Sequence, residues 1–188
     1  MVIGGVKHMY DKCNFDCEKH EYKSLIFNSG NMNDADETEP DTEQLGGSDI
    51  FILGWQMPQG DTEEYSLTFS VPKDALNKCR NARVFVHLIS DNSSTPTGSR
   101  FSIRLSSLFT KPNGVINIAN LNTINRNNIP VQNSPGSQQY NHYVIEFKLE
   151  DLISAEDFAL LSIARIPATN DFQGVVSITS VEFRYLSC

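Results

Sequence analysis

The 188-residue sequence has little cysteine, a single tryptophan and no long apolar run. Its four cysteines are too few and too scattered for a disulfide framework, so we expect reduced thiols. No apolar stretch reaches the roughly 18 residues that a transmembrane helix needs, so no membrane is expected as a partner. The first eight residues lack the apolar core and cleavage site of a signal peptide, and synthesis in a cytoplasm is expected.

Basic residues are also few: 15 Lys and Arg stand against 23 Asp and Glu, which gives a formal net charge of −8. This charge argues against nucleic acid or an anionic membrane surface as a partner. The nucleophile elbow, the P-loop, the dinucleotide fingerprint and the HExxH pattern are all missing. No pair of carboxylates is spaced along one strand as in a glycosidase. We therefore expect no enzymatic activity.

What the sequence has is strand periodicity, strongest in residues 82–106. Residues 82–90 place apolar side chains on both faces and predict a central strand covered on both sides; these are Val84, Val86 and Leu88 on one face and Phe85, His87 and Ile89 on the other. The turn formers of 91–100 follow, and then a strand in which Phe101, Ile103 and Leu105 alternate with polar residues. His87 is interpreted as a core histidine, and His142 as solvent-facing.

Further strands are predicted at 22–27, 49–56, 64–71, 115–118, 140–149, 160–166 and 174–185. The apolar phase slips by one residue near Thr179 and Ser180, which indicates a β-bulge. Short helical turns are predicted at 72–79 and 150–158. The pattern is that of an all-β protein, an antiparallel β-sandwich of jelly-roll type with about eight strands in one domain, residues 22–188.

Residues 33–47 hold six acidic residues within ten positions and no basic partner. A calcium loop requires carboxylates at fixed alternation and a glycine within the turn, and this segment has neither. A tail for a basic partner is the other alternative, and a solvated loop is the preferred interpretation.

Residues 1–21 form an N-terminal arm without strand periodicity. The arm contains four nitrogen and sulfur ligand types within 13 positions: His8, Cys13, Cys17 and His20. Four such ligands can close around one tetrahedral zinc ion, and zinc is the only cofactor that the sequence suggests. The spacing matches no common zinc module, so the preferred interpretation is a polar arm with cysteines that pack as small residues. Its apolar residues are expected to contact a neighbouring subunit.

Residues 108–139 are predicted to form a long, asparagine-rich connection. Small apolar anchors are spaced through it, at Ile116, Ile118, Leu121, Ile124 and Ile129. A loop that only solvates the surface would not need them, so we expect either contact with a neighbouring subunit or a cover over the edge of its own sheet. The first interpretation makes these five residues assembly contacts.

The order of segments resembles the β-sandwich structural proteins of tailed phages and related viruses. The likeness lies in the strand that ends in Pro72, the central strand pair, the late loop from Arg165 to Asp171, and a final strand with Val181, Phe183 and Tyr185. It covers residues 22–187, and the N-terminal arm departs from it. The resemblance implies a virion component (capsid, decoration protein or appendage) that contacts other virion proteins and itself in a symmetric homo-oligomer, trimers being frequent.

Two other functions remain open, because one fold hosts many functions. One is a carbohydrate-binding β-sandwich module that uses Trp55 or the asparagine-rich loops as its contact surface. Trp55 and Tyr65 together could line a sugar platform, although aromatic residues in alternation more often form core. The other is an adaptor stabilised by zinc at residues 8–20.

Overall fold

The computed structural model describes residues 21–34, 42–45, 52–60, 64–78, 81–91, 98–132 and 140–187. Its strands are β1 (Glu21–Asn28), β2 (Asn33–Asp34), β3 (Thr42–Leu45), β4 (Ile52–Met57), β5 (Glu64–Ser70), β6 (Arg83–Asp91), β7 (Arg100–Thr110), β8 (Asn122–Pro130), β9 (Tyr140–Lys148), β10 (Phe158–Ile166) and β11 (Val176–Ser187). Two short 3-10 turns, η1 (Ser29–Asn31) and η2 (Ile118–Asn120), complete the described elements. No described helix is long and apolar enough to cross a bilayer.

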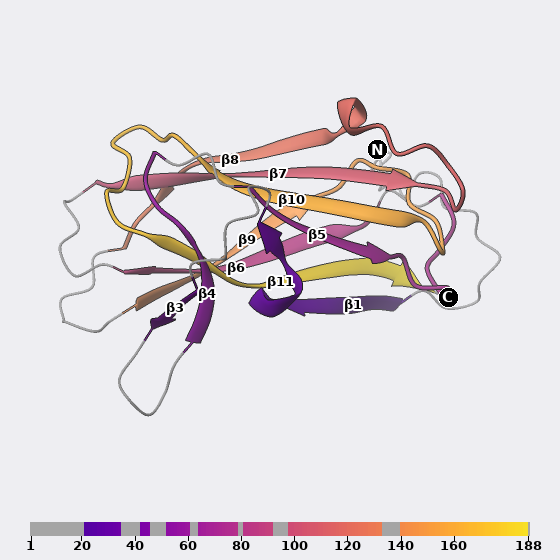
Figure 1. Ribbon diagram of the computed structural model, residues 1–188, viewed down its shortest axis with the longest axis horizontal. Helices are drawn as coiled ribbons and strands as arrows, with labels where there is room; N and C mark the ends of the chain where they lie inside the picture. Colours follow the sequence, from indigo (N-terminus) through magenta and orange to yellow (C-terminus); the bar gives the residue numbers. More distant parts are fainter. Residues whose placement is uncertain are drawn as a thin grey trace, which may run out of the picture.

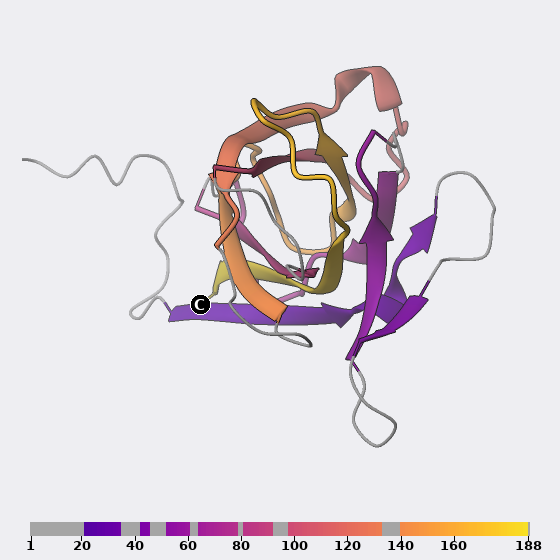
Figure 2. The ribbon, with the colours of Figure 1, turned by 90° about the vertical axis from the view of Figure 1, so that its left-hand side faces the viewer.

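The strands form two antiparallel sheets. One has six strands in the order β3-β4-β11-β6-β9, with β1 also paired to β11, and the other has five in the order β2-β5-β10-β7-β8. Figures 1 and 2 show the two sheets as the layers of a sandwich, with β7, β8 and β10 in the upper layer of Figure 1 and β1, β6 and β11 in the lower one. The predicted all-β antiparallel sandwich is confirmed.

The core lies between the sheets and is built by the side chains of alternate residues. Strands β6, β7, β10 and β11 contribute the fully buried residues Val84, Val86, Leu88, Phe101, Ile103, Leu105, Leu161, Ile163, Val181 and Phe183. The predicted bulge is confirmed, since the register of β11 against β6 shifts between Ile178 and Ser180. The bulge lets residues on both sides of the phase slip, Val176 and Phe183 among them, enter the same core.

The predicted two-sided burial of β6 is wrong. On its second face Ile89 is buried, but Phe85 and His87 are only half-buried, because the six-stranded sheet packs against the other sheet on one side only. Residues 160–166 were also predicted to be apolar on both faces, and there the outward face of β10 is buried in part. Ser162 and Ala164 are buried, whereas Leu160 and Ile166 are half-buried.

The predicted helical turns at 72–79 and 150–158 are absent from the described residues of those segments. Residues 154–157 form a single turn, in which Asp157 N donates to the Ser154 carbonyl at 3.2 Å, and they also bond to the residue that follows β5. Val71 N donates to the Asp157 carbonyl and Glu156 N donates to the Val71 carbonyl. The Asp157 carboxylate accepts from Ser154 N at 2.8 Å. These partners satisfy the backbone groups that a helical turn would have used.

Part of the long connection that was predicted at residues 108–139 is a strand in the structure. Strand β7 continues to Thr110, and β8 pairs with it through residues 122–130, whereas 115–118 is not a strand. Ile124 and Ile129 pack against the core of the same chain. Within the acidic segment, expected to be a solvated loop, β2 and β3 are strands, and residues 35–41 lie outside the described part. Of the predicted N-terminal arm, residues 1–20 also lie outside it, and Glu21 begins β1.

Candidate functional site: the outer face of the six-stranded sheet

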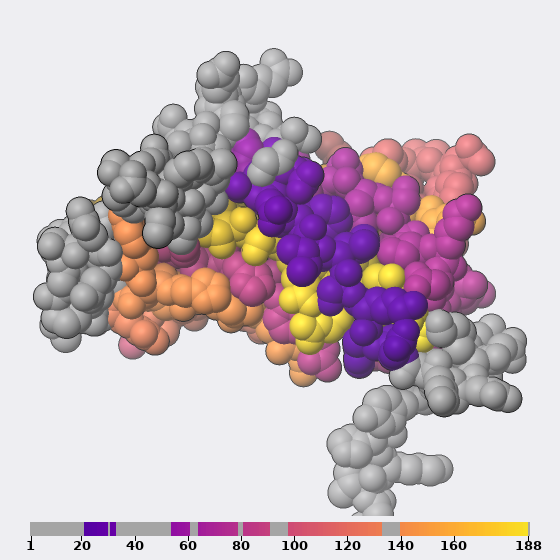
Figure 3. All heavy atoms as spheres, turned by 90° about the horizontal axis from the view of Figure 1, so that it is seen from below, coloured from indigo at the N-terminus to yellow at the C-terminus, as the bar shows by residue number. Residues whose placement is uncertain are grey.

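One broad surface of the sandwich carries aromatic, charged and apolar side chains together. It is the outer face of the six-stranded sheet, formed by β1, β11, β6 and β9, which lie side by side in that order. Figure 3 looks onto this face, with β1 in indigo, β11 in yellow, β6 in magenta and β9 in orange. We call it the sheet face; its side chains are Tyr22, Ser24, Ile26, Arg83, Phe85, His87, His142, Val144, Glu146, Lys148, Glu182 and Arg184.

A hollow of about 190 Å³ lies at one end of the sheet face. Its lining residues are Tyr22, Asn81, Ala82, Arg83 and Lys148, and we call it the Tyr22 hollow. The side chain of Tyr22 is 49% exposed, the most exposed aromatic residue of the described chain. The ring remains accessible because Tyr22 lies on the outward parity of β1, opposite Leu186 of β11.

Two cations border the Tyr22 hollow, and their environments differ. Arg83 Nη1 donates to Glu146 Oε1 at 2.8 Å, and the guanidinium carbon lies 5.8 Å from the Tyr22 ring centroid. The ammonium group of Lys148 forms no hydrogen bond or ion pair with any described residue. The hollow therefore combines an aromatic ring, a guanidinium fixed by a carboxylate, and an ammonium group whose donors are available.

At the centre of the sheet face, four side chains contact one another: Ser24, Phe85, Glu182 and Arg184. The Arg184 guanidinium lies 4.3 Å from the ring centroid of Phe85 and covers that ring. Glu182 accepts from Ser24 Oγ at 2.5 Å and from Arg184 Nη2 at 2.8 Å. Burial alone would raise the pKa of Glu182, but the bonds from Ser24 and Arg184 outweigh it, so this pKa lies below its ordinary value.

A histidine pair lies beside this centre. His87 Nδ1 and His142 Nε2 are 3.3 Å apart, and the ring planes differ by 18°. His87 is half-buried and His142 is exposed. Burial, with His142 as a second cause, lowers the pKa of His87, and Glu182 opposes the shift. The predicted exposure of His142 is confirmed, whereas His87 faces outward and is not a core residue.

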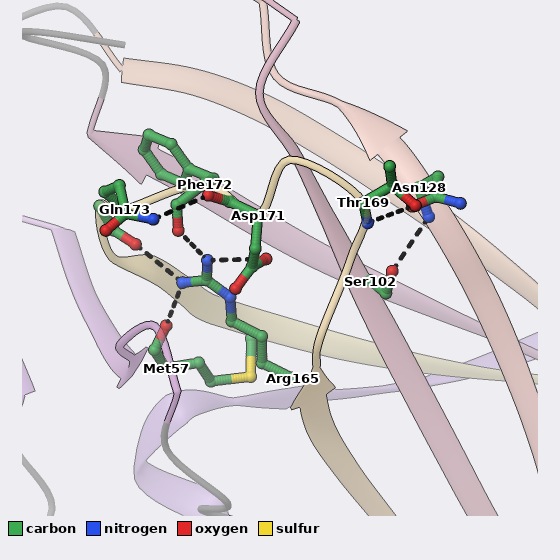
Figure 4. A network of polar contacts seen from close by, with 9 residues as sticks. Met57, Ser102, Asn128, Arg165, Thr169, Asp171, Phe172 and Gln173 are labelled. Atoms are coloured by element: carbon green, nitrogen blue, oxygen red, sulfur yellow. Dashed lines mark hydrogen bonds and ion pairs between the residues drawn. The ribbon is translucent and has the colours of Figure 1, made fainter. Parts of the chain in front are cut away.

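A second polar cluster surrounds Arg165, at the loop between β10 and β11. Figure 4 shows its guanidinium between the Met57 carbonyl and the loop residues Asp171 and Phe172. Arg165 donates to the carbonyls of Met57 at 3.0 Å and Gly174 at 2.7 Å, and also to that of Phe172. Its Nη2 is 3.4 Å from Asp171 Oδ1, so the two residues named by the viral resemblance do meet.

Burial lowers the pKa of Arg165, and Asp171 offsets part of this shift. A cavity of about 200 Å³ adjoins the cluster, lined by Gly60, Arg104, Ala164, Arg165, Ile166, Pro167 and Asp171. The contacts of Arg165 bind the chain to itself. We interpret this cluster as a structural tie between the loop and β4.

The structure places the site residues that were predicted from the sequence in different environments. His8, Cys13, Cys17 and His20 lie outside the described residues, and within the described part no three His, Cys, Asp or Glu side chains are grouped to hold a metal. Among the predicted assembly contacts, Ile116 and Ile118 are exposed, whereas Leu121, Ile124 and Ile129 are half-buried. Whether these five residues contact another subunit stays a prediction.

The sugar platform of Trp55 and Tyr65 is wrong, and the alternative interpretation of these residues as core is confirmed. Trp55 is 3% exposed and Tyr65 is 1% exposed. Trp55 Nε1 donates to the Ser29 carbonyl, and the Tyr65 hydroxyl donates to the Gln56 carbonyl. Tyr22, Arg83 and Lys148 were not predicted as site residues from the sequence. The parity of β1 could have indicated Tyr22, because Leu25 and Phe27 take the inner positions.

No protein-family model and no curated protein sequence matches the chain. Among solved structures, the chain is similar to dimeric latent PorU from Porphyromonas gingivalis, with 9% identity and a TM-score of 0.45 over 89% of this chain. It spans only 13% of PorU.

Two carbohydrate-binding modules are also similar. A CBM28 specific for non-crystalline cellulose has 15% identity and a TM-score of 0.43, over 76% of this chain and 79% of that one. TmCBM61, in complex with β-1,4-galactotriose, has 9% identity and a TM-score of 0.36, over 88% of this chain and 86% of that one. What is established for this chain is a β-sandwich, and no family match supports the phage-protein resemblance.

Proposed function

We propose that this chain is a carbohydrate-binding β-sandwich module that acts by binding and not by catalysis, and that the Tyr22 hollow holds a sugar ring. The observation that carries the proposal is the exposed Tyr22 ring beside the ammonium group of Lys148, which has no partner among the described residues. The sequence-based alternative placed sugar contact at Trp55 or the asparagine-rich loops. The proposal moves it to the opposite surface of the sheet.

The chemistry of a sugar ring fits these groups. A pyranose has an apolar C–H face, which packs on an aromatic ring, and hydroxyl oxygens around its edge, which accept hydrogen bonds. Lys148 and Arg83 supply N–H donors at the border of the Tyr22 hollow. The hollow of about 190 Å³ holds about six waters at ~30 Å³ each, and pockets for drug-sized ligands measure roughly 300–1,000 Å³. It therefore suits one sugar residue at the end of a glycan.

The test is a glycan array that carries neutral and acidic glycans, followed by calorimetry on the best ligand. Tyr22→Ala and Lys148→Ala are expected to weaken binding by about tenfold or more, in line with the loss of roughly 1–3 kcal/mol of stacking or hydrogen bonding. Lys73→Ala is the matched control, because Lys73 is 87% exposed and pairs with Glu156 away from the sheet face. If Tyr22→Ala and the unaltered chain bind the glycan equally well, the Tyr22 hollow is not the sugar-binding site.

A second function is a virion structural role through protein–protein contact, as the viral resemblance implies. The observation that favours it is the loop after β7, which exposes three apolar side chains: Val115 at 88%, Ile116 at 52% and Ile118 at 70%. We call these residues the apolar loop. Exposed apolar side chains that lie together mark contact sites more often than solvated surface does. The occupant we propose is another copy of the same chain, in a closed homo-oligomer such as a trimer.

The assembly proposal is tested by sedimentation of the full chain at several concentrations. Replacing all three apolar-loop residues by serine is expected to convert the oligomer to monomer without loss of thermal stability. Leu152→Ser is the control, since Leu152 is 50% exposed and lies outside the apolar loop. A monomeric unaltered chain would refute the proposal that this chain assembles by itself. Electron microscopy of the native source would then decide whether it belongs to a virion.

A further inference from the structure

We propose that His87 and His142 together bind one divalent transition-metal ion of the zinc class on the sheet face. The two imidazoles come from neighbouring strands, β6 and β9, and present one ring nitrogen each to the other. The site shares no residue with the Tyr22 hollow or with the N-terminal Cys and His residues. It stands independently of the carbohydrate proposal.

The separation of the two nitrogens is the distance that a shared metal requires. Two nitrogen ligands at about 2.0–2.1 Å from a tetrahedral zinc ion are about 3.3–3.4 Å from each other. His87 Nδ1 and His142 Nε2 are 3.3 Å apart. In the absence of metal, the same separation allows one neutral ring to donate an N–H hydrogen bond to the other. Binding replaces that proton with the ion and needs no movement of either strand.

The strands hold the pair in this arrangement. His87 is opposite Val144 in the register of β6 and β9, and His142 is opposite Ile89, so the histidines are diagonal neighbours on one face. The backbone at His87 is further fixed by Thr179, whose hydroxyl donates to the His87 carbonyl at 3.2 Å. His142 is exposed, so its ring has room to turn and aim Nε2 at an ion beside His87 Nδ1.

The surroundings of the pair leave part of the metal's coordination shell open. Glu182, on the neighbouring strand β11, is close enough to His87 to influence its charge. No third His, Cys, Asp or Glu of the described residues completes the group. Two coordination positions therefore remain for water or for a donor from a bound molecule. Imidazole nitrogens suit Zn²⁺, Cu²⁺ and Ni²⁺, whereas Ca²⁺ and Mg²⁺ prefer oxygen ligands.

The experiment is a titration of the full chain with Zn²⁺, followed by nuclear magnetic resonance of the imidazole nitrogens. Each histidine reports separately, so the His87 and His142 signals are distinguished from those of His8 and His20. The result expected is that the His87 and His142 signals change together and saturate at the same zinc concentration, and that Mg²⁺ leaves both unchanged. Calorimetry on a Cys13→Ser, Cys17→Ser chain is expected to show one zinc ion per chain bound by the pair.

His142→Asn is the decisive variant, because an exposed side chain can be replaced without disturbing the core. It should weaken zinc binding at the His87 signal by at least about tenfold, since even the loss of an outer-shell partner costs roughly 10–100-fold. His20→Asn is the matched control and should leave the His87 signal unaffected. Unchanged His87 and His142 signals at millimolar Zn²⁺ would overturn the proposal and leave a hydrogen-bonded pair. Equal affinity in His142→Asn would overturn it too.

Discussion

The ring of Phe172 lies against Gly174 so closely that a Cβ atom on Gly174 would be 2.4 Å from the ring's Cζ atom. Both residues belong to the loop between β10 and β11, and the carbonyl oxygens of both accept hydrogen bonds from the guanidinium of Arg165. The guanidinium carbon lies 5.8 Å from the centroid of the Phe172 ring. The missing side chain at Gly174 therefore allows Phe172, at 2% exposure, to close over the Arg165 cluster.

The first prediction is that Gly174→Ala destabilises the protein by about 1–3 kcal/mol, the usual cost of extra atoms in a packed site. Urea unfolding measures the change. The cause is checked by repeating the substitution in a Phe172→Leu background, where the added methyl group has more room. We expect the two substitutions to couple by more than about 0.5 kcal/mol. Additive effects would show that the ring is not what Gly174 accommodates.

The second prediction concerns the guanidinium of Arg165. Arg165→Lys is expected to cost at least about 2 kcal/mol of unfolding free energy, because one ammonium group cannot reach three carbonyls and Asp171, and each buried acceptor left without a partner costs about 1–3 kcal/mol. Arg126→Lys is the control. Arg126 is exposed and donates once, to the Glu146 carbonyl at 2.9 Å, so its replacement should change stability by less than about 0.5 kcal/mol. A similar cost for both substitutions would contradict a special role for Arg165.

Much of the fold could be predicted because alternation along a strand determines which side chains share a face. The inner residues of β5, β6, β9 and β11 follow that rule, and the bulge in β11 is visible as a phase slip. Alternation does not tell whether a second layer covers the other face. Phe85 is apolar and still lies outside, covered by the guanidinium of Arg184 and not by another sheet. The sequence of β6 alone does not contain that information.

The candidate site was harder to predict, because its residues are far apart in the chain. Tyr22, Arg83 and Lys148 come from β1, β6 and β9, and only the strand order brings them to one hollow. Strand order and register depend on long-range pairing that no local pattern specifies. The strand β8 was missed for a related reason. Its asparagines are exposed and typical of a loop, while Ile124 and Ile129 pack against the core.

The third prediction separates β8 from the apolar loop by hydrogen exchange. In the isolated chain, the amides of β8 that bond to β7 are expected to exchange slowly, because the pairing is within one chain. The amides of 115–118 are expected to exchange fast. If the chain assembles through the apolar loop, residues 115–118 become slower in the oligomer and β8 stays the same. Fast exchange throughout β8 in the isolated chain would show that this strand needs a partner to form.

The last prediction is a pH dependence that originates from Glu182. The folded protein lowers the pKa of this carboxylate below its ordinary 4.5, through bonds from Ser24 and Arg184 that outweigh burial. A lowered carboxylate pKa stabilises the fold above the unfolded-state value, and this contribution disappears as the pH falls through the folded-state value. The side chain of Glu182 is 15% exposed, so water screens these bonds only in part. The window in which stability is lost therefore lies below about pH 4.5.

Glu182→Gln is expected to lower the unfolding free energy by about 1–2 kcal/mol at pH 7, because hydrogen bonds to a charged group contribute about 1.5–3 kcal/mol and glutamine keeps part of them. At pH 3 the difference between the two proteins should shrink toward zero, because Glu182 is then increasingly protonated. Ser24→Ala removes one of the two donors. It should lower the unfolding free energy by a smaller amount than Glu182→Gln, and this difference should also shrink as the pH falls. Urea unfolding at pH 7, 5, 4 and 3 measures all three proteins. A cost of Glu182→Gln that stays constant across this range would mean that the contribution of Glu182 does not depend on its charge.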